Sequence, residues 1–241
     1  MKKIIAFLMA AVMAQFAVAQ VNEGKVVFEE KIDMYRRIPK ENEQMRAMLP
    51  QFRTTKFEML FADNKSLYRQ AEEAADLSEQ PQGGGGMVMR FGGADNVFYK
   101  DFSSQSTVEK RNMMEKDFLV EDSIRNISWK LIDGETKTIA GHVCKKATGK
   151  SQMGLDIIAW YAEDISLSSG PAQFGGLPGL ILGMDVNAGE FVYTATSINK
   201  DVKKADIKAP AKGKKVTPAE FAKIRKELMG DGNGPVRIVT N

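Results

Sequence analysis

The sequence predicts a mainly β protein, with one curled antiparallel sheet, a short helix near the N-terminus and a helix at the C-terminus. Three observations support this fold class. About ten short segments alternate apolar and polar residues, and turn residues separate most neighbouring segments. Helical spacing of apolar residues occurs in only two short segments. A sheet of so many twisted strands rarely stays flat, so it should curl and present a concave face.

The N-terminal residues have the pattern of a secretory signal peptide. Lys2 and Lys3 precede an apolar run over residues 4–18, and Ala17 and Ala19 fit an A-x-A cleavage site. The run is too short to span a membrane comfortably, so we expect residues 1–19 to be removed. The mature protein should then be soluble and exported, as a periplasmic, outer-membrane-associated or secreted protein without a membrane-spanning segment.

Charge argues against a nucleic acid partner. The chain has 34 basic and 31 acidic residues, which gives a formal net charge of +3. Removal of Lys2 and Lys3 lowers this charge to +1, too little for a general attraction to phosphate. The single cysteine, Cys144, excludes a disulfide within the chain.

One β-rich domain is expected over residues 20–200, and it starts with a half-buried strand at residues 26–35. The apolar residues that share one face of this strand are Val26, Phe28, Ile32 and Met34. A short helix is expected within residues 39–52, because the residues after Pro39 favour helices.

Turns and glycines divide the remainder of this domain. Asp63 and Asn64 join two alternating segments and predict a hairpin. Residues 72–95 include four consecutive glycines and should form a flexible insertion. Asp133 and Gly134 predict a further turn. The expected strands after the first are residues 55–62, 65–71, 96–102, 106–114, 117–124, 128–132, 137–148, 155–162, 180–186 and 190–199.

Residues 170–185 contain five glycines and two prolines around an apolar run. Glycine and proline exclude a regular helix or central strand in the first half of this stretch. It therefore predicts a tight, buried loop that leads into the strand at residues 180–186.

The last segment, residues 201–241, should consist of a basic linker, a short helix and a frayed tail. Seven lysines within residues 200–215 indicate a solvated linker. Thr217 and Glu220 have the spacing of a capping box, and Pro218 stands at the first helical position. The helix should extend to about residue 229.

Four segments between residues 24 and 200 carry a set of motifs that resembles a known family. Residues 176–181 read GLPGLI, residues 159–161 read AWY, and residues 141–148 fit G-x-x-C-x-K-A. Phe57, Leu60 and Phe61, with residues 66–68 reading SLY, resemble an early hairpin of the type F-x-L-x-F…S-x-Y. Together they are similar to the GLPGLI family of secreted bacterial proteins. This resemblance implies an exported β-rich protein and no defined chemistry.

An apolar ligand site is expected beside the loop at residues 170–185. The candidate ligand-binding residues are Trp160, Tyr161, Phe174, Leu177, Pro178 and Leu180. They would line the concave face of the sheet, and plain core packing is the competing interpretation. The architecture resembles the half-barrel of LolA-like lipoprotein carriers, with the two helices covering the concave face. We therefore expect a non-enzymatic envelope protein that binds an acyl chain, a lipidated partner or another protein, without a cofactor.

Two other functions are weaker alternatives. His142 is the only histidine, and an extended strand places it about 7 Å from Cys144, too far for a catalytic hydrogen bond. His142 and Cys144, with Met87 and Met89, are candidate ligands for a copper-type metal. An enzyme is less expected still, because no known catalytic spacing is present and no catalytic residue is assigned.

Overall fold

The structure of the chain, a computed structural model, describes residues 20–72 and 96–229. The predicted signal peptide, almost all of the predicted insertion and the predicted tail lie outside these residues. Within them, no helix has both the length and the apolar character needed to cross a membrane.

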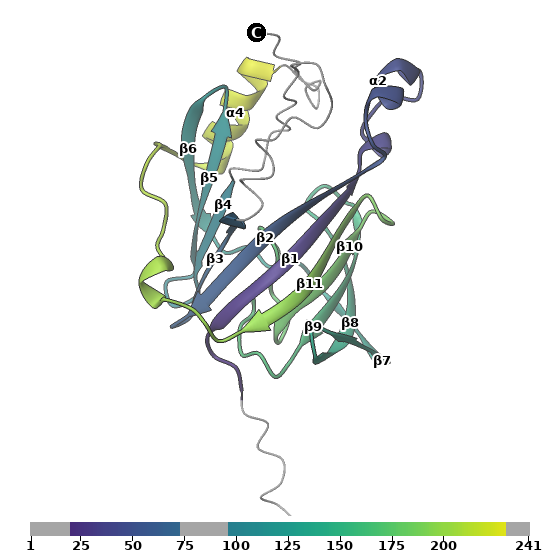
Figure 1. The fold of residues 1–241 in the computed structure, drawn as a ribbon. Helices are drawn as coiled ribbons and strands as arrows, with labels where there is room; N and C mark the ends of the chain where they lie inside the picture. The colour runs from purple at the N-terminus through teal and green to yellow at the C-terminus, as the bar shows by residue number, and fades with distance from the viewer. Residues whose placement is uncertain (1–19, 73–95, 230–241) are drawn as a thin grey trace, which may run out of the picture.

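Twelve strands of the described chain form a single sheet, and every neighbouring pair is antiparallel except β12 and β6 (Figure 1). Their order across the sheet is β12-β6-β5-β4-β3-β2-β1-β11-β10-β9-β8-β7. This confirms the mainly β, antiparallel fold class. The strands are β1 (Gly24–Asp33), β2 (Phe52–Ala62), β3 (Lys65–Gln70), β4 (Val97–Asp101), β5 (Ser106–Met113), β6 (Lys116–Ser123), β7 (Lys130–Ile139), β8 (His142–Lys150), β9 (Asp156–Ala162), β10 (Leu180–Val186), β11 (Phe191–Asn199) and β12 (Lys214–Val216).

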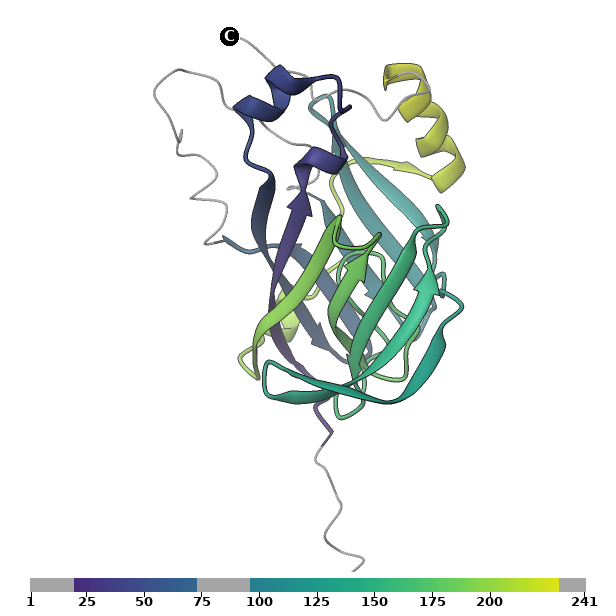
Figure 2. The same ribbon diagram turned by 90° about the vertical axis from the view of Figure 1, so that its right-hand side faces the viewer.

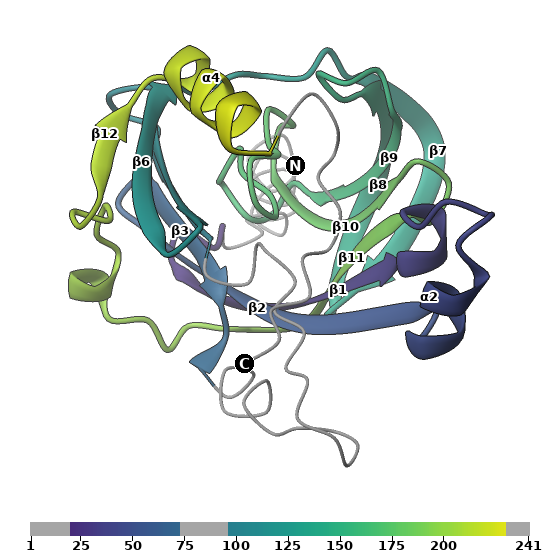
Figure 3. The same cartoon turned by 90° about the horizontal axis from the view of Figure 1, so that it is seen from above.

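The sheet is open and curled, with two limbs that face each other. Figure 2 shows β8 to β10 in front and the teal strands β4 to β6 behind them. Viewed from above, β6 and β12 lie on one side, β7 to β9 on the other, and β1 and β2 connect the two sides (Figure 3). We call the inner side of this curl the concave face. The closer likeness to lipoprotein carriers stays a prediction.

The segment between β9 and β10, residues 163–179, lies inside the curl and is bonded to both limbs. On one limb, the Lys100 ammonium of β4 donates a hydrogen bond to the Phe174 carbonyl oxygen at 2.5 Å. On the other, the indole N–H of Trp129, just before β7, donates to the Gly175 carbonyl oxygen at 2.9 Å. The predicted buried loop is thus confirmed, and we call it the plug loop.

The helices differ from the prediction in size and place. The range 39–52, expected to be helical, contains only the six-residue α2 (Glu43–Met48), and the 3-10 turn η2 (Met34–Arg36) replaces the end of the predicted first strand. Helix α2 buries none of its residues and lies beyond the ends of β1 and β2 (Figure 1). It therefore does not cover the concave face, and the plug loop takes that place.

The C-terminal helix α4 (Pro218–Met229) has the expected cap. The Glu220 backbone N–H donates to Thr217 Oγ1 at 3.3 Å, and the Thr217 N–H donates to Glu220 Oε2 at 2.7 Å. Phe221 packs edge-on against Phe118 of β6, with ring centroids 5.6 Å apart. This helix therefore covers one edge of the sheet.

The turn predicted at Asp133 and Gly134 is wrong, because β7 continues through these residues. A register shift between Ile132 and Thr136 accommodates them as a bulge, with Gly134 at a φ of +78°. The chain reverses instead at Ala140 and Gly141, whose φ values are +48° and +86°. A glycine with positive φ serves a bulge as well as a turn, so the local sequence does not separate them.

The prediction of a solvated basic linker is only partly correct, because part of the linker is buried. Ile207 is buried and, with Val202, packs on the convex face against Leu60, Leu67 and Tyr99. The short 3-10 turn η3 (Lys204–Asp206) and β12 belong to the same segment. Lys204 adds ion pairs to Glu23 and Asp63, both at 2.9 Å, so apolar and charged contacts together hold this segment on the sheet.

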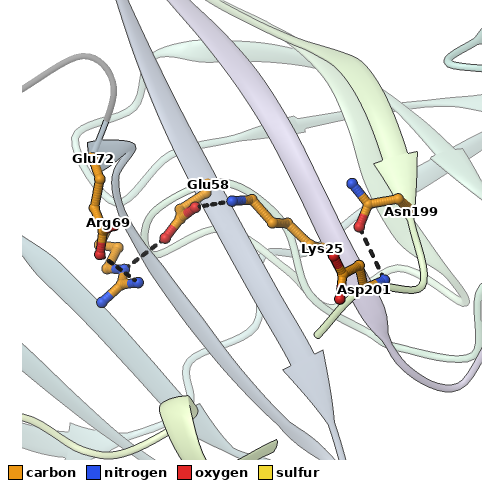
Figure 4. A network of polar contacts seen from close by, with 6 residues as sticks. All are labelled: Lys25, Glu58, Arg69, Glu72, Asn199 and Asp201. Atoms are coloured by element: carbon orange, nitrogen blue, oxygen red, sulfur yellow. Dashed lines mark hydrogen bonds and ion pairs between the residues drawn. The ribbon is translucent and has the colours of Figure 1, made fainter. Parts of the chain in front are cut away.

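The convex face also carries an ion-pair network around Glu58, shown in Figure 4. The Glu58 carboxylate, with 4% of its side chain exposed, lies 2.6 Å from Lys25 Nζ and 2.7 Å from Arg69 Nε. Arg69 also contacts Glu72 at 3.5 Å. These residues connect β1, β2 and β3 on the side away from the plug loop.

Candidate functional site

A polar cluster lies on the concave face among apolar side chains. It consists of Glu30 on β1, Arg53 on β2, Tyr68 on β3 and Tyr193 on β11, and we call it the Glu30 cluster. Glu30 is directly opposite Tyr193, and alternate residues of a strand share a face. Glu30 therefore points to the same side as Phe28, which is fully buried.

The Glu30 carboxyl and the Tyr193 hydroxyl form the centre of this cluster. Burial raises the pKa of Glu30, against the opposing effects of the hydrogen bond from Tyr193 and the positive charges of Arg53 and Arg37. Burial, with the nearby Glu30 charge, also raises the pKa of Tyr193 well above its usual value. Tyr193 therefore stays a hydrogen-bond donor at neutral pH.

Tyr68 adds a hydroxyl group that has no hydrogen-bond partner among the described residues. Its ring stacks on Phe57 at 5.1 Å and meets Phe28 and Phe98 edge-on at 6.0 and 6.2 Å. Burial and the charge of Glu30 raise its pKa well above the usual value. A buried hydroxyl without a partner costs free energy, so its position needs an explanation beyond packing.

Aromatic rings and charged groups surround the cluster. The Arg111 guanidinium lies 5.1 Å from the centre of the Phe98 ring and 2.8 Å from the Glu109 carboxylate. The Arg37 guanidinium lies 5.6 Å from the centre of the Phe191 ring. The concave face therefore combines hydrogen-bonding groups with aromatic rings, of which Tyr68, Phe98 and Tyr193 are buried and Phe191 is half-buried.

The residues predicted to bind an apolar ligand do not share one surface. Tyr161, Phe174 and Leu177 belong to one buried cluster, in which Phe174 meets Tyr193 edge-on at 6.2 Å. Leu180 is fully buried in a different cluster. These side chains pack against one another and against the plug loop.

The other two predicted residues lie elsewhere. Trp160 is half-buried, with the ammonium groups of Lys137 and Lys146 about 6 Å from its ring. Pro178 is exposed. Adjacent residues of a strand point to opposite faces, so Trp160 and Tyr161 cannot line the same wall.

The predicted metal ligands are only partly described, because Met87 and Met89 lie outside the described residues. His142 Nδ1 lies 2.6 Å from Asp164 Oδ2, a partner that the sequence did not indicate. Cys144 is buried, and burial raises the pKa of its thiol to about 11. Within residues 20–72 and 96–229, no group of three or more His, Cys, Asp or Glu residues is arranged to hold a metal ion.

The Glu30 cluster was missed in the sequence, although one signal was present. Val26, Phe28 and Ile32 predict one apolar face of the first strand, and Glu30 falls on that same face. A carboxylate within an apolar stripe needs a partner in the folded protein. The partner, Tyr193, is on a strand more than 160 residues away in the chain, which the local pattern cannot reveal.

Comparison with known proteins gives a similarity to one family over part of the chain, and a fold. The family model described as "N-glycanase peptide, N-terminal domain" matches residues 100–219. The chain is similar to an N-glycanase N-terminal domain. No curated protein sequence matches it.

Two solved structures of PNGF-II, in space groups P21 and C2, have the same fold. Both have a TM-score of 0.58, with 15% and 14% sequence identity over 85% and 87% of this chain. At such identities the likeness shows the fold alone. This chain covers only 33% and 34% of the two PNGF-II chains, so it spans about a third of their length.

The family assignment made from sequence motifs is therefore corrected. The matching family model covers residues 159–161 and 176–181, on which the GLPGLI resemblance relied, and belongs to a different family. Gly179 explains why so short a motif misleads: it has a φ of +151° and lies against the Ala162 carbonyl oxygen. Such a close approach selects glycine for steric reasons.

Proposed function

We propose that the concave face binds an oligosaccharide of the N-linked type, without catalysing its cleavage. The observation that carries this proposal is the Glu30–Tyr193 pair beside the unpartnered Tyr68 hydroxyl. Sugar hydroxyl groups donate to a carboxylate and accept from phenol and guanidinium groups, so one ligand would satisfy several members of the cluster. Sugar rings also pack on aromatic side chains such as the half-buried Phe191.

The similarity to an N-glycanase N-terminal domain supports the choice of ligand class. The name of that family concerns glycans, and PNGF-II has the same fold over the length of this chain. Export, predicted from residues 1–19, would bring the protein to glycans outside the cytoplasm. We propose a binding role, because the described cluster presents one half-buried carboxyl group where glycoside hydrolysis ordinarily uses two.

The apolar ligand expected from the sequence has less support. The side chains of Tyr161, Phe174 and Leu177 are each buried and are already in contact with one another. An acyl chain would have to displace the plug loop, which is bonded to both limbs. A lipid or a lipidated envelope partner therefore finds no support in this arrangement.

The test is calorimetric titration of the full chain with a desialylated biantennary N-glycan. Glu30→Gln and Tyr193→Phe should each weaken binding by about tenfold, because a hydrogen bond to a charged group contributes about 1.5–3 kcal/mol. Glu29→Gln is the matched control, since Glu29 precedes Glu30 on the same strand and points to the convex face. Absence of binding by the unaltered protein, or an equal loss in Glu29→Gln, would contradict the proposal.

Tyr68→Phe separates a ligand role from a structural one. This variant keeps the ring contacts and removes only the unpartnered hydroxyl, so the free energy of unfolding should stay the same or rise. Its affinity for the glycan should nevertheless fall. A glycan affinity equal to that of the unaltered protein would exclude Tyr68 from the site.

A further inference from the structure

A basic pocket lies near the Glu30 cluster. The chain between β1 and α2 forms an open pocket of about 600 Å³ beyond the end of β1. Four of its seven lining residues are cationic and none is acidic, the four being Arg36, Arg37, Lys40 and Arg46. Such a concentration of one charge attracts anionic groups.

Hydrogen bonds hold the walls of this pocket in place before any ligand arrives. The Arg46 guanidinium donates to the carbonyl oxygens of Tyr35 at 2.8 Å and Ile38 at 2.9 Å. The Tyr35 hydroxyl donates back to the Arg46 carbonyl oxygen at 2.9 Å. Arg36 donates to the carbonyl oxygen of Ala188, in the turn between β10 and β11, at 2.8 Å. A preformed site loses little entropy on binding.

Two cations of the pocket remain available to a ligand. Arg37 and Lys40 are exposed, and no acidic side chain of the described ranges lies within ion-pairing distance of either. Arg46 Nε is buried and has no hydrogen-bond partner within the same ranges. Neither Arg37 nor Lys40 is therefore held in an ion pair, although the charge of Arg37 acts on Glu30.

Arg37 connects this pocket to the proposed glycan site. It lies against the Phe191 ring at 5.6 Å, and its charge acts on both Glu30 and Tyr193. A glycan that contacts the Glu30 cluster would thus reach the pocket with its next sugar. We propose that the pocket of Arg37 and Lys40 binds the carboxylate or sulfate of an acidic sugar, so that acidic glycans are the preferred ligands; this rests on the proposed function.

The test compares one sialylated biantennary N-glycan with the same glycan after sialidase treatment, by calorimetric titration at low salt. The full chain should bind the sialylated form about tenfold more tightly, as a charge-assisted contact would give. In the double variant Arg37→Gln, Lys40→Gln this ratio should fall to about one. The control Lys203→Gln, Lys208→Gln removes the same charge from exposed positions on the linker and should keep the ratio.

The possible failures are distinct. Equal affinity of the unaltered protein for both glycans overturns the acidic preference. An equal fall of the affinity ratio in the control variant overturns the assignment of this preference to the pocket. Either result leaves the proposed function intact. A sulfated form of the neutral glycan shows whether carboxylate and sulfate are both accepted. If no glycan binds, the proposed function fails. Titration with inorganic sulfate then tests the pocket by itself. If the NMR signals of Arg37 and Lys40 do not saturate at about 1 mM sulfate, the pocket does not bind anions as proposed.

Discussion

At the scale of the residue, two glutamates on opposite faces of the sheet show how partners decide the state of a buried carboxyl group. Glu58 is buried on the convex face, and burial alone would raise its pKa, but the hydrogen bonds and charges of Lys25 and Arg69 lower it. At Glu30, the hydrogen bond from Tyr193 and the charges of Arg53 and Arg37 oppose the effect of burial less strongly, so its pKa is raised. Glu58 therefore stabilises the fold, whereas Glu30 is the carboxyl group that we propose to contact a ligand.

Glu58→Gln should lower the free energy of unfolding by about 1–2 kcal/mol at pH 7, because it removes the carboxylate that Lys25 and Arg69 share. The pKa of Glu58 is lower in the folded than in the unfolded protein. Its contribution is therefore complete above the ordinary carboxyl pKa and is lost as pH falls through the folded value. Urea unfolding at pH 7 and at pH 3 should show the difference between variant and unaltered protein shrink in acid.

Glu163→Gln is the control for this experiment. Glu163 pairs with Lys145 at 2.7 Å, but both side chains are about half exposed. Solvent screens such a pair, so its loss should matter much less. A Glu58→Gln variant as stable as Glu163→Gln at pH 7 would show that the Glu58 network adds nothing.

At the scale of the element, the plug loop depends on close approach of backbone to backbone. Gly179 has a φ of +151°, and a Cβ atom there would lie 2.2 Å from the Ala162 carbonyl oxygen. Gly170 is similarly crowded, because a Cβ would lie 2.9 Å from the Ile181 side chain. The loop can enter β10 only because glycine leaves this space free.

Gly179→Ala should lower the free energy of unfolding by more than about 4 kcal/mol, because strain and a backbone clash act together. Gly154→Ala is the matched comparison, since Gly154 also has a positive φ, +79°, but nothing lies within 4 Å of its Cβ position. It should cost only about 1–2 kcal/mol. Soluble yield and urea unfolding measure both, and equal losses would refute the crowding argument.

At the scale of the whole molecule, Lys100 joins the plug loop to the limb that does not contain it. Its ammonium donates to the Phe174 carbonyl oxygen inside the curl, and Ser66 and Ser169 make a second buried contact between the same parts at 3.2 Å. Burial lowers the pKa of Lys100 to about 7, against a smaller opposing effect of Glu109. The two limbs are therefore held together by a cation that is costly to bury.

This cost predicts an unusual dependence of stability on pH. Between the folded pKa of about 7 and the ordinary lysine value of 10.5, the unfolded state binds the extra proton, so stability rises with pH. The free energy of unfolding should therefore rise by about 2 kcal/mol more in the unaltered protein than in Lys100→Met between pH 7 and pH 9. Urea unfolding at pH 7, 8 and 9 measures the slope.

Lys208→Met serves as the control for the slope, because Lys208 is exposed. This variant should keep the pH dependence of the unaltered protein even if its stability differs. If the free energy of unfolding changed equally with pH in Lys100→Met and in the unaltered protein, burial would not lower the pKa of Lys100.

The sequence by itself determined most of the local structure. Alternation predicted most strands within a few residues, the pair Asp63–Asn64 predicted the β2–β3 hairpin, and Thr217 with Glu220 predicted the start of α4. These features depend on contacts between residues close in the chain, so the pattern of one segment contains the information.

Only the tertiary structure decided how the strands curl, what fills the curl and where the polar groups meet. Glu30, Tyr68 and Tyr193 come from three separate strands, and the Asp164 partner of His142 comes from the start of the plug loop. Their proximity follows from the order of strands in the sheet and from the bonds of Lys100 and Trp129 to the plug loop. Such long-range pairings depend on the packing of the whole chain, which no single segment encodes.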